Sequence, residues 1–167
     1  MEKSSVEEIV RSLNRHQVQY LIVGGLAVVA HGYVRLTADV DLMLALDAGN
    51  LTRAIAALRN LDYRPRAPVR FEEFIDPATR QKWAAEKNMT VFSLFSPAHP
   101  ATEIDLFLEP PIDFAAAYSR CARIELNEGL TAPFCGIDDL VKMKSLAGRP
   151  RDLEDIAQLN RLRQGEQ

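Results

Sequence analysis

Apolar residues recur along the chain with two periods, one typical of helices and one typical of strands. The first of them are spaced at i, i+3, i+4 and i+7, which predicts an amphipathic helix over residues 5–16. Residues 20–23 form a short apolar run bounded by Gly24 and Gly25, and this pattern predicts a buried strand followed by a turn. The same reasoning predicts further helices over residues 26–31, 51–61, 113–119, 137–147 and 151–162.

Alternation of apolar and polar residues predicts the strands that carry acidic side chains. In residues 39–44 the alternation places Asp39 and Asp41 on one face, because side chains two positions apart in a strand point the same way. Residues 102–108 alternate as well, and there Asp105 lies on the face opposite to the apolar residues. Strands over 90–95 and 102–108 are expected to pair as one hairpin, and those over 123–126 and 130–134 as another.

Strands interleaved with helices predict an α/β fold of the α+β kind, in which helices flank a mixed β-sheet. With 167 residues, of which 47% are hydrophobic, the chain fits one domain over residues 1–167. We expect its core over about 18–110 and a closing hairpin and helices over about 113–163. The stretch 65–100 is harder to interpret, although a helix interrupted before Pro77 is expected there, with Trp83 packed in the core.

Charge and cysteine content limit the classes of function. Lys and Arg number 20 against 23 Asp and Glu, so the net charge of −3 provides no general basic field that would attract nucleic acid. Cys121 and Cys135 are too few for a disulfide framework and are expected to be reduced core thiols. The longest apolar stretch, 20–30, is too short to span a bilayer, so we expect a cytoplasmic protein without a membrane contact.

The acidic residues suggest metal-assisted phosphate chemistry. Asp39 and Asp41 on one strand and Asp105 on a neighbouring strand would present three carboxylates to one space. Mg²⁺ prefers such oxygen ligands, and a pair of metal ions about 3.5–4 Å apart stabilises the charge that develops in nucleotidyl transfer. Gly24 and Gly25 lack side chains, so a triphosphate could approach the backbone there. We therefore expect Mg²⁺, with Mn²⁺ as an alternative, and an NTP as co-substrate.

These motifs together resemble a known family. Gly24-Gly25, thirteen intervening residues, Asp39-Val40-Asp41-Leu42 and a later Ile104-Asp105-Leu106 resemble the signature of the DNA polymerase β-like nucleotidyltransferase superfamily. The sequence around the first two motifs, together with 139–144 and 148–156, resembles the small branch of AbiEii-like and minimal nucleotidyltransferases. The resemblance extends from about Tyr20 to Leu159 and is weak between residues 65 and 100.

The resemblance implies a role for particular residues. Asp39 and Asp41 would hold the metal ions, and Asp105 would complete the metal site and help to deprotonate the acceptor. The residues expected to bind the nucleotide are Gly24, Gly25, Arg35, Thr37, Lys144 and Arg149. For Arg149 and the nearby Asp152 and Asp155, a network that only fastens the last helix to the sheet is an equally open interpretation.

The sequence does not identify the acceptor, and three hypotheses on the function stay open. The first is a toxin-like enzyme of a toxin–antitoxin system that modifies tRNA, other RNA or protein. The second is a nucleotidyltransferase for antibiotics or small metabolites, and the third is a silent nucleotide-binding module that acts through a partner. Because we see no separate acceptor-binding helical domain, we expect either a macromolecular acceptor or a homodimer or toxin or antitoxin partner that completes the cleft.

Overall fold

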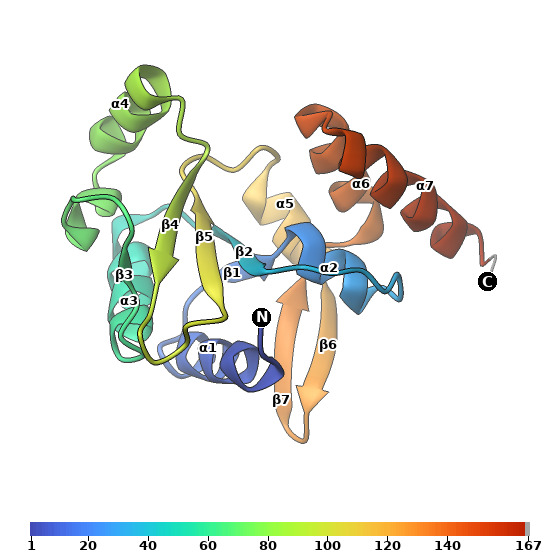
Figure 1. Cartoon of the computed structure of the whole chain (residues 1–167), viewed down its shortest axis with the longest axis horizontal. Coiled ribbons are helices and arrows are strands. Elements are labelled where there is room, and N and C mark those ends of the chain that lie inside the picture. The colour runs from blue at the N-terminus through green and yellow to red at the C-terminus, as the bar shows by residue number, and fades with distance from the viewer. Residues whose placement is uncertain (166–167) are drawn as a thin grey trace.

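A mixed β-sheet of seven strands runs through the middle of the molecule (Figure 1). The computed structural model describes residues 1–165. The strand order across the sheet is β3-β4-β5-β2-β1-β7-β6, and helices flank the sheet, as the sequence predicts. The strands are β1 (Tyr20–Ile22), β2 (Asp39–Leu44), β3 (Arg64–Pro65), β4 (Val91–Phe95), β5 (Glu103–Phe107), β6 (Ala122–Asn127) and β7 (Leu130–Phe134).

Two parallel pairs distinguish this sheet from a simple series of hairpins. Strand β2 lies parallel to β5, and β1 lies parallel to β7, whereas the other neighbouring strands are antiparallel. Both predicted hairpins, β4–β5 and β6–β7, are confirmed. The parallel pairing of β2 with β5 is the decisive one for the site, since it makes the Cα atoms of Asp41 and Asp105 direct partners.

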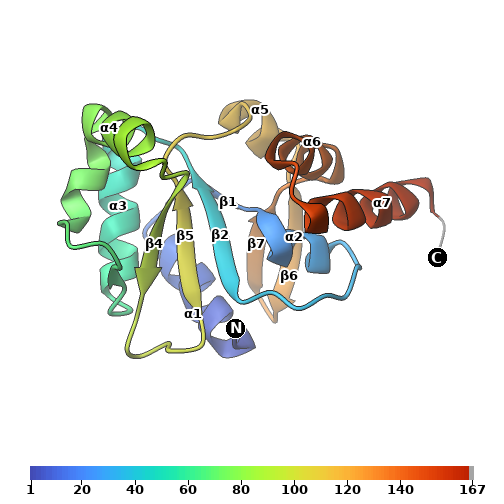
Figure 2. The same cartoon turned by 45° about the horizontal axis from the view of Figure 1, so that its top comes forward.

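Seven α-helices and one 3₁₀ helix surround the sheet within the described residues. Helices α1 and α3 pack together on the far side of the strands in Figure 2, whereas α4 and the pair α6–α7 stand on either side of the near face. The helices are α1 (Lys3–Arg15), α2 (Gly24–Ala30), α3 (Ala48–Arg59), η1 (Phe71–Ile75), α4 (Pro77–Lys87), α5 (Phe114–Ser119), α6 (Ile137–Ala147) and α7 (Pro150–Gln164).

Helix α2 begins two residues earlier than the sequence predicts. Gly24 and Gly25 are its first two residues instead of a separate turn before it. Gly24 has a φ of +61°, a backbone conformation that residues with a β-carbon rarely adopt. Sequence patterns did not reveal this start, because glycine pairs usually indicate the end of regular structure.

The stretch 65–100, which the sequence left poorly defined, contains η1 and α4, which pack against β4 through aromatic side chains. The chain breaks before Pro77, as predicted, and the Asp76 carboxylate caps α4 by accepting a hydrogen bond from the Thr79 N–H. Trp83 is buried and stacks on Phe92, with ring centroids 5.1 Å apart, which confirms that it belongs to the core. Helix α4 is therefore fixed to the sheet and can form one side of a cleft.

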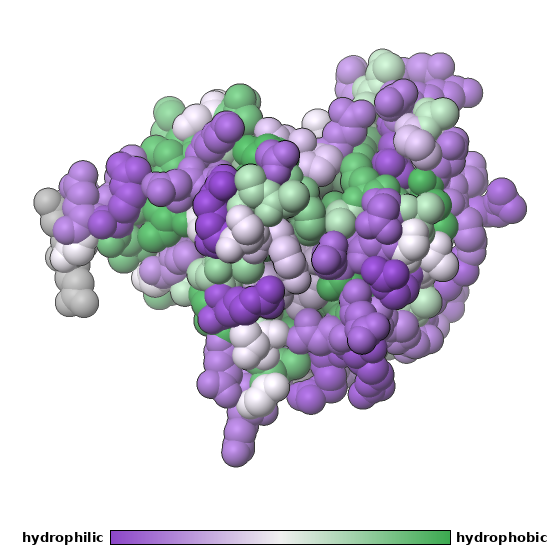
Figure 3. Space-filling view, turned by 180° about the vertical axis from the view of Figure 1, so that it is seen from behind, coloured by the Kyte–Doolittle hydropathy of each residue, from purple (hydrophilic) through white to green (hydrophobic). Residues whose placement is uncertain are grey.

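One of the two thiols and most large apolar side chains lie in the interior. Both cysteines are free; Cys135 is fully buried, and this burial raises the pKa of its thiol to about 12, whereas Cys121 is half-buried. Figure 3 shows hydrophilic residues over much of the face seen from behind, with hydrophobic residues in smaller groups. No helix within residues 1–165 is long and apolar enough to cross a membrane. The large hydrophobic residues that are exposed are Val34, Leu36, Phe95, Leu146 and Leu153.

Candidate active site

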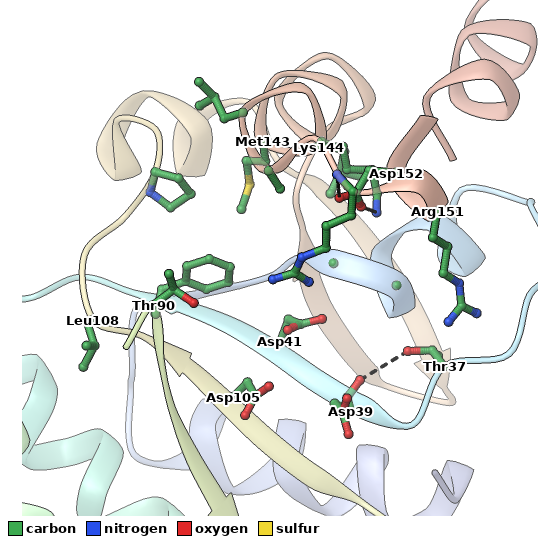
Figure 4. A pocket seen from close by; sticks show the side chains of 18 of the residues that line it. Thr37, Asp39, Asp41, Thr90, Asp105, Leu108, Met143, Lys144, Arg151 and Asp152 are labelled. Carbon is green, nitrogen blue, oxygen red and sulfur yellow. Dashed lines mark hydrogen bonds and ion pairs between the residues drawn. The ribbon is translucent and has the colours of Figure 1, made fainter. Parts of the chain in front are cut away.

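A cleft of about 780 Å³ opens on the near face of the sheet, lined by Ala84 of α4 on one side and by residues of α6 and the start of α7 on the other. Figure 4 shows its α6–α7 side. Strands β2 and β5 form its floor. Every residue that the sequence predicts for the site contributes to its lining, although these residues come from distant parts of the chain: Gly24, Gly25, Arg35, Thr37, Asp39, Asp41, Asp105, Lys144 and Arg149.

Three carboxylates gather on the floor of this cleft. Asp39 and Asp41 lie on the same half-buried face of β2, and Asp105 lies on the corresponding face of β5, as the alternation predicts. Because β2 and β5 are parallel and in register, Asp105 stands directly beside Asp41 and diagonally from Asp39. Figure 4 shows the three side chains on neighbouring strands at the bottom of the cleft.

Glycine at position 24 leaves room for one of these carboxylates. A β-carbon on Gly24 would lie 1.9 Å from Asp41 Oδ2, a distance at which two atoms cannot coexist. The backbone N–H of Gly25 faces the Asp41 carboxyl and acts to lower its pKa. A β-carbon on Gly25 would in turn lie 2.7 Å from Thr37 Oγ1. The start of α2 is thus packed directly against the residues of the site, which explains the need for two consecutive glycines.

Burial and mutual repulsion disfavour negative charge on the cleft floor. Burial is the largest effect on Asp41 and, with the nearby Asp105 and Asp39, raises the pKa of its carboxyl to about 6, although the Gly25 N–H and Lys144 act in the opposite direction. The pKa of Asp39 is raised by burial first, and then by Asp105 and Glu103. Carboxylates held together at this cost are typical of functional sites, where a bound cation would offset their repulsion.

The carboxylates suit a metal ion that is completed by other ligands. Within residues 1–165, no group of three or more His, Cys, Asp and Glu side chains is arranged so that it holds an ion by itself. Mg²⁺ usually takes only one or two carboxylates and completes its shell with water and substrate phosphates, so Asp41 with either neighbouring aspartate fits that mode. The assignment of Asp39, Asp41 and Asp105 as metal ligands stays a prediction.

The opposite wall of the cleft is basic and largely organised by ion pairs. Lys144 on α6 is buried, and its Nζ lies 2.6 Å from Asp155 Oδ2 and 3.2 Å from Asp152 Oδ1, both on α7. Arg35 pairs with the same Asp155 from the loop before β2. This network ties α7 to α6 and to that loop, and not to the sheet as the structural interpretation of the sequence expected.

Arg149 differs from the other basic residues of this wall. Its backbone N–H donates to Asp152 Oδ2 at 3.2 Å and so helps to begin α7. Its side chain is exposed, lines the cleft and has no acidic partner among the described residues. Arg149 is therefore available to an anionic ligand without breaking an existing ion pair.

The whole arrangement agrees with what the comparison with known families finds. A family model described as "Nucleotidyltransferase of unknown function (DUF6036)" matches residues 4–163. The chain belongs to this family. It is therefore an enzyme of the nucleotidyltransferase superfamily, as the motifs predict, whereas the narrower AbiEii-like resemblance is not confirmed. A search of curated proteins finds no match to this nucleotidyltransferase.

Solved structures support the fold of the nucleotidyltransferase. A solution structure of the antibiotic-resistance factor ANT(2'')-Ia is similar with a TM-score of 0.58 and 14% identity, over 94% of this chain and 81% of that one. A crystal structure of ANT(2'')-Ia in complex with adenylyl-2''-tobramycin is similar with a TM-score of 0.56 and 13% identity, over 98% and 95% of the two chains. At this identity, the likeness concerns the fold.

Sequence patterns singled out neither Arg151, Thr90 and Glu109, which line the cleft of this nucleotidyltransferase, nor Ser93, which contacts the site from outside the lining. Arg151 lines the cleft and donates from Nη2 to the backbone oxygen of Leu36. Arg151 lies two residues after Arg149, at the predicted start of a helix, and this position could have indicated that both arginines face the same site. Ser93 on β4 donates from Oγ to Asp105 Oδ1 at 2.5 Å. A polar residue within the apolar run 90–95 indicated a special position, but its partner depends on the strand register.

Proposed function

We propose that the protein transfers a nucleoside monophosphate from an NTP to an acceptor hydroxyl, with Mg²⁺ or alternatively Mn²⁺ as cofactor. The observation that carries this proposal is that one cleft has acidic residues on its floor and basic residues on its wall. Its floor presents Asp39, Asp41 and Asp105, whereas its wall presents Lys144 and Arg149. A cleft with carboxylates facing cations suits a metal–triphosphate complex, whose metal ions face the carboxylates and whose outer phosphates face the cations.

The donor half of the reaction is assigned to particular residues. Asp39, Asp41 and Asp105 would hold the metal, which when bound neutralises charge on the transferring phosphate and on the leaving pyrophosphate. Asp105 also accepts the proton of the attacking hydroxyl. Lys144 and Arg149 bind the β- and γ-phosphates. The residues that shape the remaining phosphate-side wall are Gly24, Gly25, Arg35 and Thr37.

The nucleoside lies against the apolar half of the same cleft. Leu140, Met143 and Ala147 share one face of α6, and the described residues opposite them include Met89 and Leu108. Figure 4 shows Met143 and Leu108 on the side of the cleft away from Arg151. Such a surface packs against a base, and Thr90 and Glu109, which line the cleft next to Met89 and Leu108, are the polar groups that can distinguish one base edge from another.

Two classes of acceptor remain in the proposal. A macromolecular acceptor, RNA such as tRNA or a protein, follows from the motif resemblance and its toxin–antitoxin setting, with a homodimer or a toxin or antitoxin as the partner. A small-molecule acceptor is favoured by a different observation. ANT(2'')-Ia, whose complex with adenylyl-2''-tobramycin is solved, matches this chain over 95% of its own length. That protein binds a nucleotidylated antibiotic with a fold that this chain matches over almost its whole length. The lack of a separate acceptor-binding domain is therefore no argument against a small-molecule acceptor.

One labelling experiment tests the proposal and separates the acceptor classes. The protein is incubated with each α-³²P-NTP and Mg²⁺ or Mn²⁺, together with tRNA, total RNA, cell protein or a panel of aminoglycosides and small metabolites. We expect label to appear in one pool, and to disappear with the Asp39→Asn/Asp41→Asn variant. Binding of NTP without transfer to any pool would favour a silent module, and neither binding nor transfer would refute the proposal.

A further inference from the structure

Ser93 holds the carboxylate of Asp105 by a short hydrogen bond. The two residues are Cα partners on the antiparallel strands β4 and β5, and Ser93 Oγ lies 2.5 Å from Asp105 Oδ1. A hydroxyl that donates to an ionised carboxylate at about 2.5–2.7 Å forms one of the stronger hydrogen bonds in proteins. Ser93 does not itself line the cleft, so any influence on the reaction has to pass through Asp105.

The segments on both edges of β4 fix the backbone from which the Ser93 hydroxyl extends. The backbone oxygen of Ser93 accepts a hydrogen bond of 2.9 Å from the N–H of Arg66, beside β3, and the antiparallel ladder with β5 fixes the other edge of β4. The side chain of Ser93 therefore starts from a position set by its two neighbours in the sheet. Its hydroxyl stands beside Asp105, on the half-buried face that also carries the carboxylates of β2.

A fixed donor matters for Asp105 because the last torsion of an aspartate is soft. The carboxyl plane has a broad rotational preference, so without a partner its two oxygens exchange places and sample many orientations. The Ser93 hydroxyl holds Oδ1, and so determines which way Oδ2 points toward the cleft. The group that acts on Asp41 in a similar way is the backbone N–H of Gly25, which cannot be removed by changing a side chain.

We propose that Ser93 is a positioning residue, which orients the Asp105 carboxylate for the metal and for the acceptor hydroxyl. This inference rests on the nucleotidyl transfer proposed above. A hydrogen bond to a metal-binding side chain usually changes metal affinity by about 10–100-fold when it is lost. Ser93 therefore acts on metal affinity and on turnover, although it touches neither the nucleotide nor the acceptor.

The test compares three variants of the full chain by Mn²⁺ binding, followed by electron paramagnetic resonance in the presence of α,β-methylene-ATP. Ser93→Ala removes the donor, and Ser93→Thr keeps the hydroxyl. Ser96→Ala is the matched control, because Ser96 lies just beyond β4 and its Oγ donates to the Leu61 backbone oxygen instead of to a site residue. Thermal melting of each variant reports the general cost of losing a serine hydroxyl in this part of the sheet.

We expect Ser93→Ala to weaken Mn²⁺ binding roughly 10-fold, and Ser93→Thr and Ser96→Ala to stay within about 3-fold of the wild type. Equal Mn²⁺ affinity in Ser93→Ala and the wild type would overturn the inference while leaving nucleotidyl transfer intact. The same holds if Ser93→Thr is as weak as Ser93→Ala, since the hydroxyl would then not be the cause. If the wild type binds neither Mn²⁺ nor the analogue, the proposed function fails, and the inference fails with it.

Discussion

The Asp41 carboxyl occupies the space that a side chain at position 24 would need. A β-carbon on Gly24 would lie 1.9 Å from Asp41 Oδ2, and the φ of Gly24 is +61°. Two separate reasons therefore require glycine at position 24: the positive φ of the backbone and the space that the Asp41 carboxyl occupies. The start of α2 and the floor of the cleft are built as one unit, so a change in one displaces the other.

Gly24→Ala should damage the site more than a comparable substitution elsewhere. The positive φ alone costs roughly 1–2 kcal/mol, and displacement of Asp41 adds about 1–3 kcal/mol. Gly129→Ala is the matched control, because Gly129 has a φ of +71° but nothing within 4 Å of its would-be β-carbon. Urea denaturation should show the larger loss for Gly24→Ala, and NTP binding should be lost only there. Equal losses in both variants would contradict this account.

Asp41→Asn should stabilise the metal-free protein at neutral pH. The folded-state pKa of Asp41, about 6, is above its unfolded value, so the wild type loses stability as the pH rises from about 4 through 6. Asparagine carries no charge, so the variant should gain about 3 kcal/mol over the wild type above pH 6, and nothing from this source below pH 4. Urea denaturation in EDTA between pH 4 and 8 measures the difference. A gain that does not depend on pH would show that charge on Asp41 is not its cause.

Lys144→Ala should reduce both stability and NTP binding. The substitution removes the cation between two nearly buried carboxylates, Asp152 and Asp155, and breaking a buried pair in this way costs about 3–5 kcal/mol. Lys142→Ala provides the control on the same helix, since Lys142 is exposed and forms no ion pair within the described residues. Its free energy of unfolding should change by less than about 0.5 kcal/mol. A Lys144→Ala variant as stable as Lys142→Ala would refute a structural role for the network.

Arg149→Ala should separate nucleotide binding from stability. Its guanidinium lines the cleft without an acidic partner among residues 1–165, so its loss should leave the free energy of unfolding unchanged within about 0.5 kcal/mol. Loss of a charge-assisted hydrogen bond to phosphate, worth about 1.5–3 kcal/mol, should weaken the NTP analogue roughly 10-fold or more. Calorimetry with α,β-methylene-ATP measures this change. The control is Arg161→Ala, at an exposed position of α7 outside the cleft, and this variant should bind the analogue normally. A similar loss there would point to general charge effects.

Local pattern was enough to predict the face on which the acidic residues lie and six of the seven strands in the described residues, all except the two-residue β3. Period-two alternation depends only on the backbone of one strand, which is why Asp39, Asp41 and Asp105 were placed correctly on their faces. The β4–β5 and β6–β7 hairpins were also predictable, since a turn with Pro97 and Pro100 lies within the first connection and the second is a short turn with Gly129. Their pairing in the structure confirms this.

Relationships between distant segments could not be derived in the same way. The parallel pairing that sets Asp41 beside Asp105 joins strands separated in the chain by three helices and two other strands, and no local pattern fixes that register. The Ser93–Asp105 hydrogen bond and the pairing of Arg35 with Asp155 have the same origin. For Gly24, the local sequence predicted a turn. The residue that requires a glycine there is Asp41, seventeen positions later in the chain, and a local pattern does not show this contact.

The central claim is that the bond between the α- and β-phosphates of an NTP is broken in this cleft. The direct measurement follows ATP labelled in parallel at the α- and γ-phosphates, with Mg²⁺ and the acceptor pools, and separates acceptor, pyrophosphate and orthophosphate. This account predicts α-label in the acceptor and γ-label only in pyrophosphate, both abolished in Asp39→Asn/Asp41→Asn. Release of γ-label as orthophosphate without transfer of α-label would contradict it.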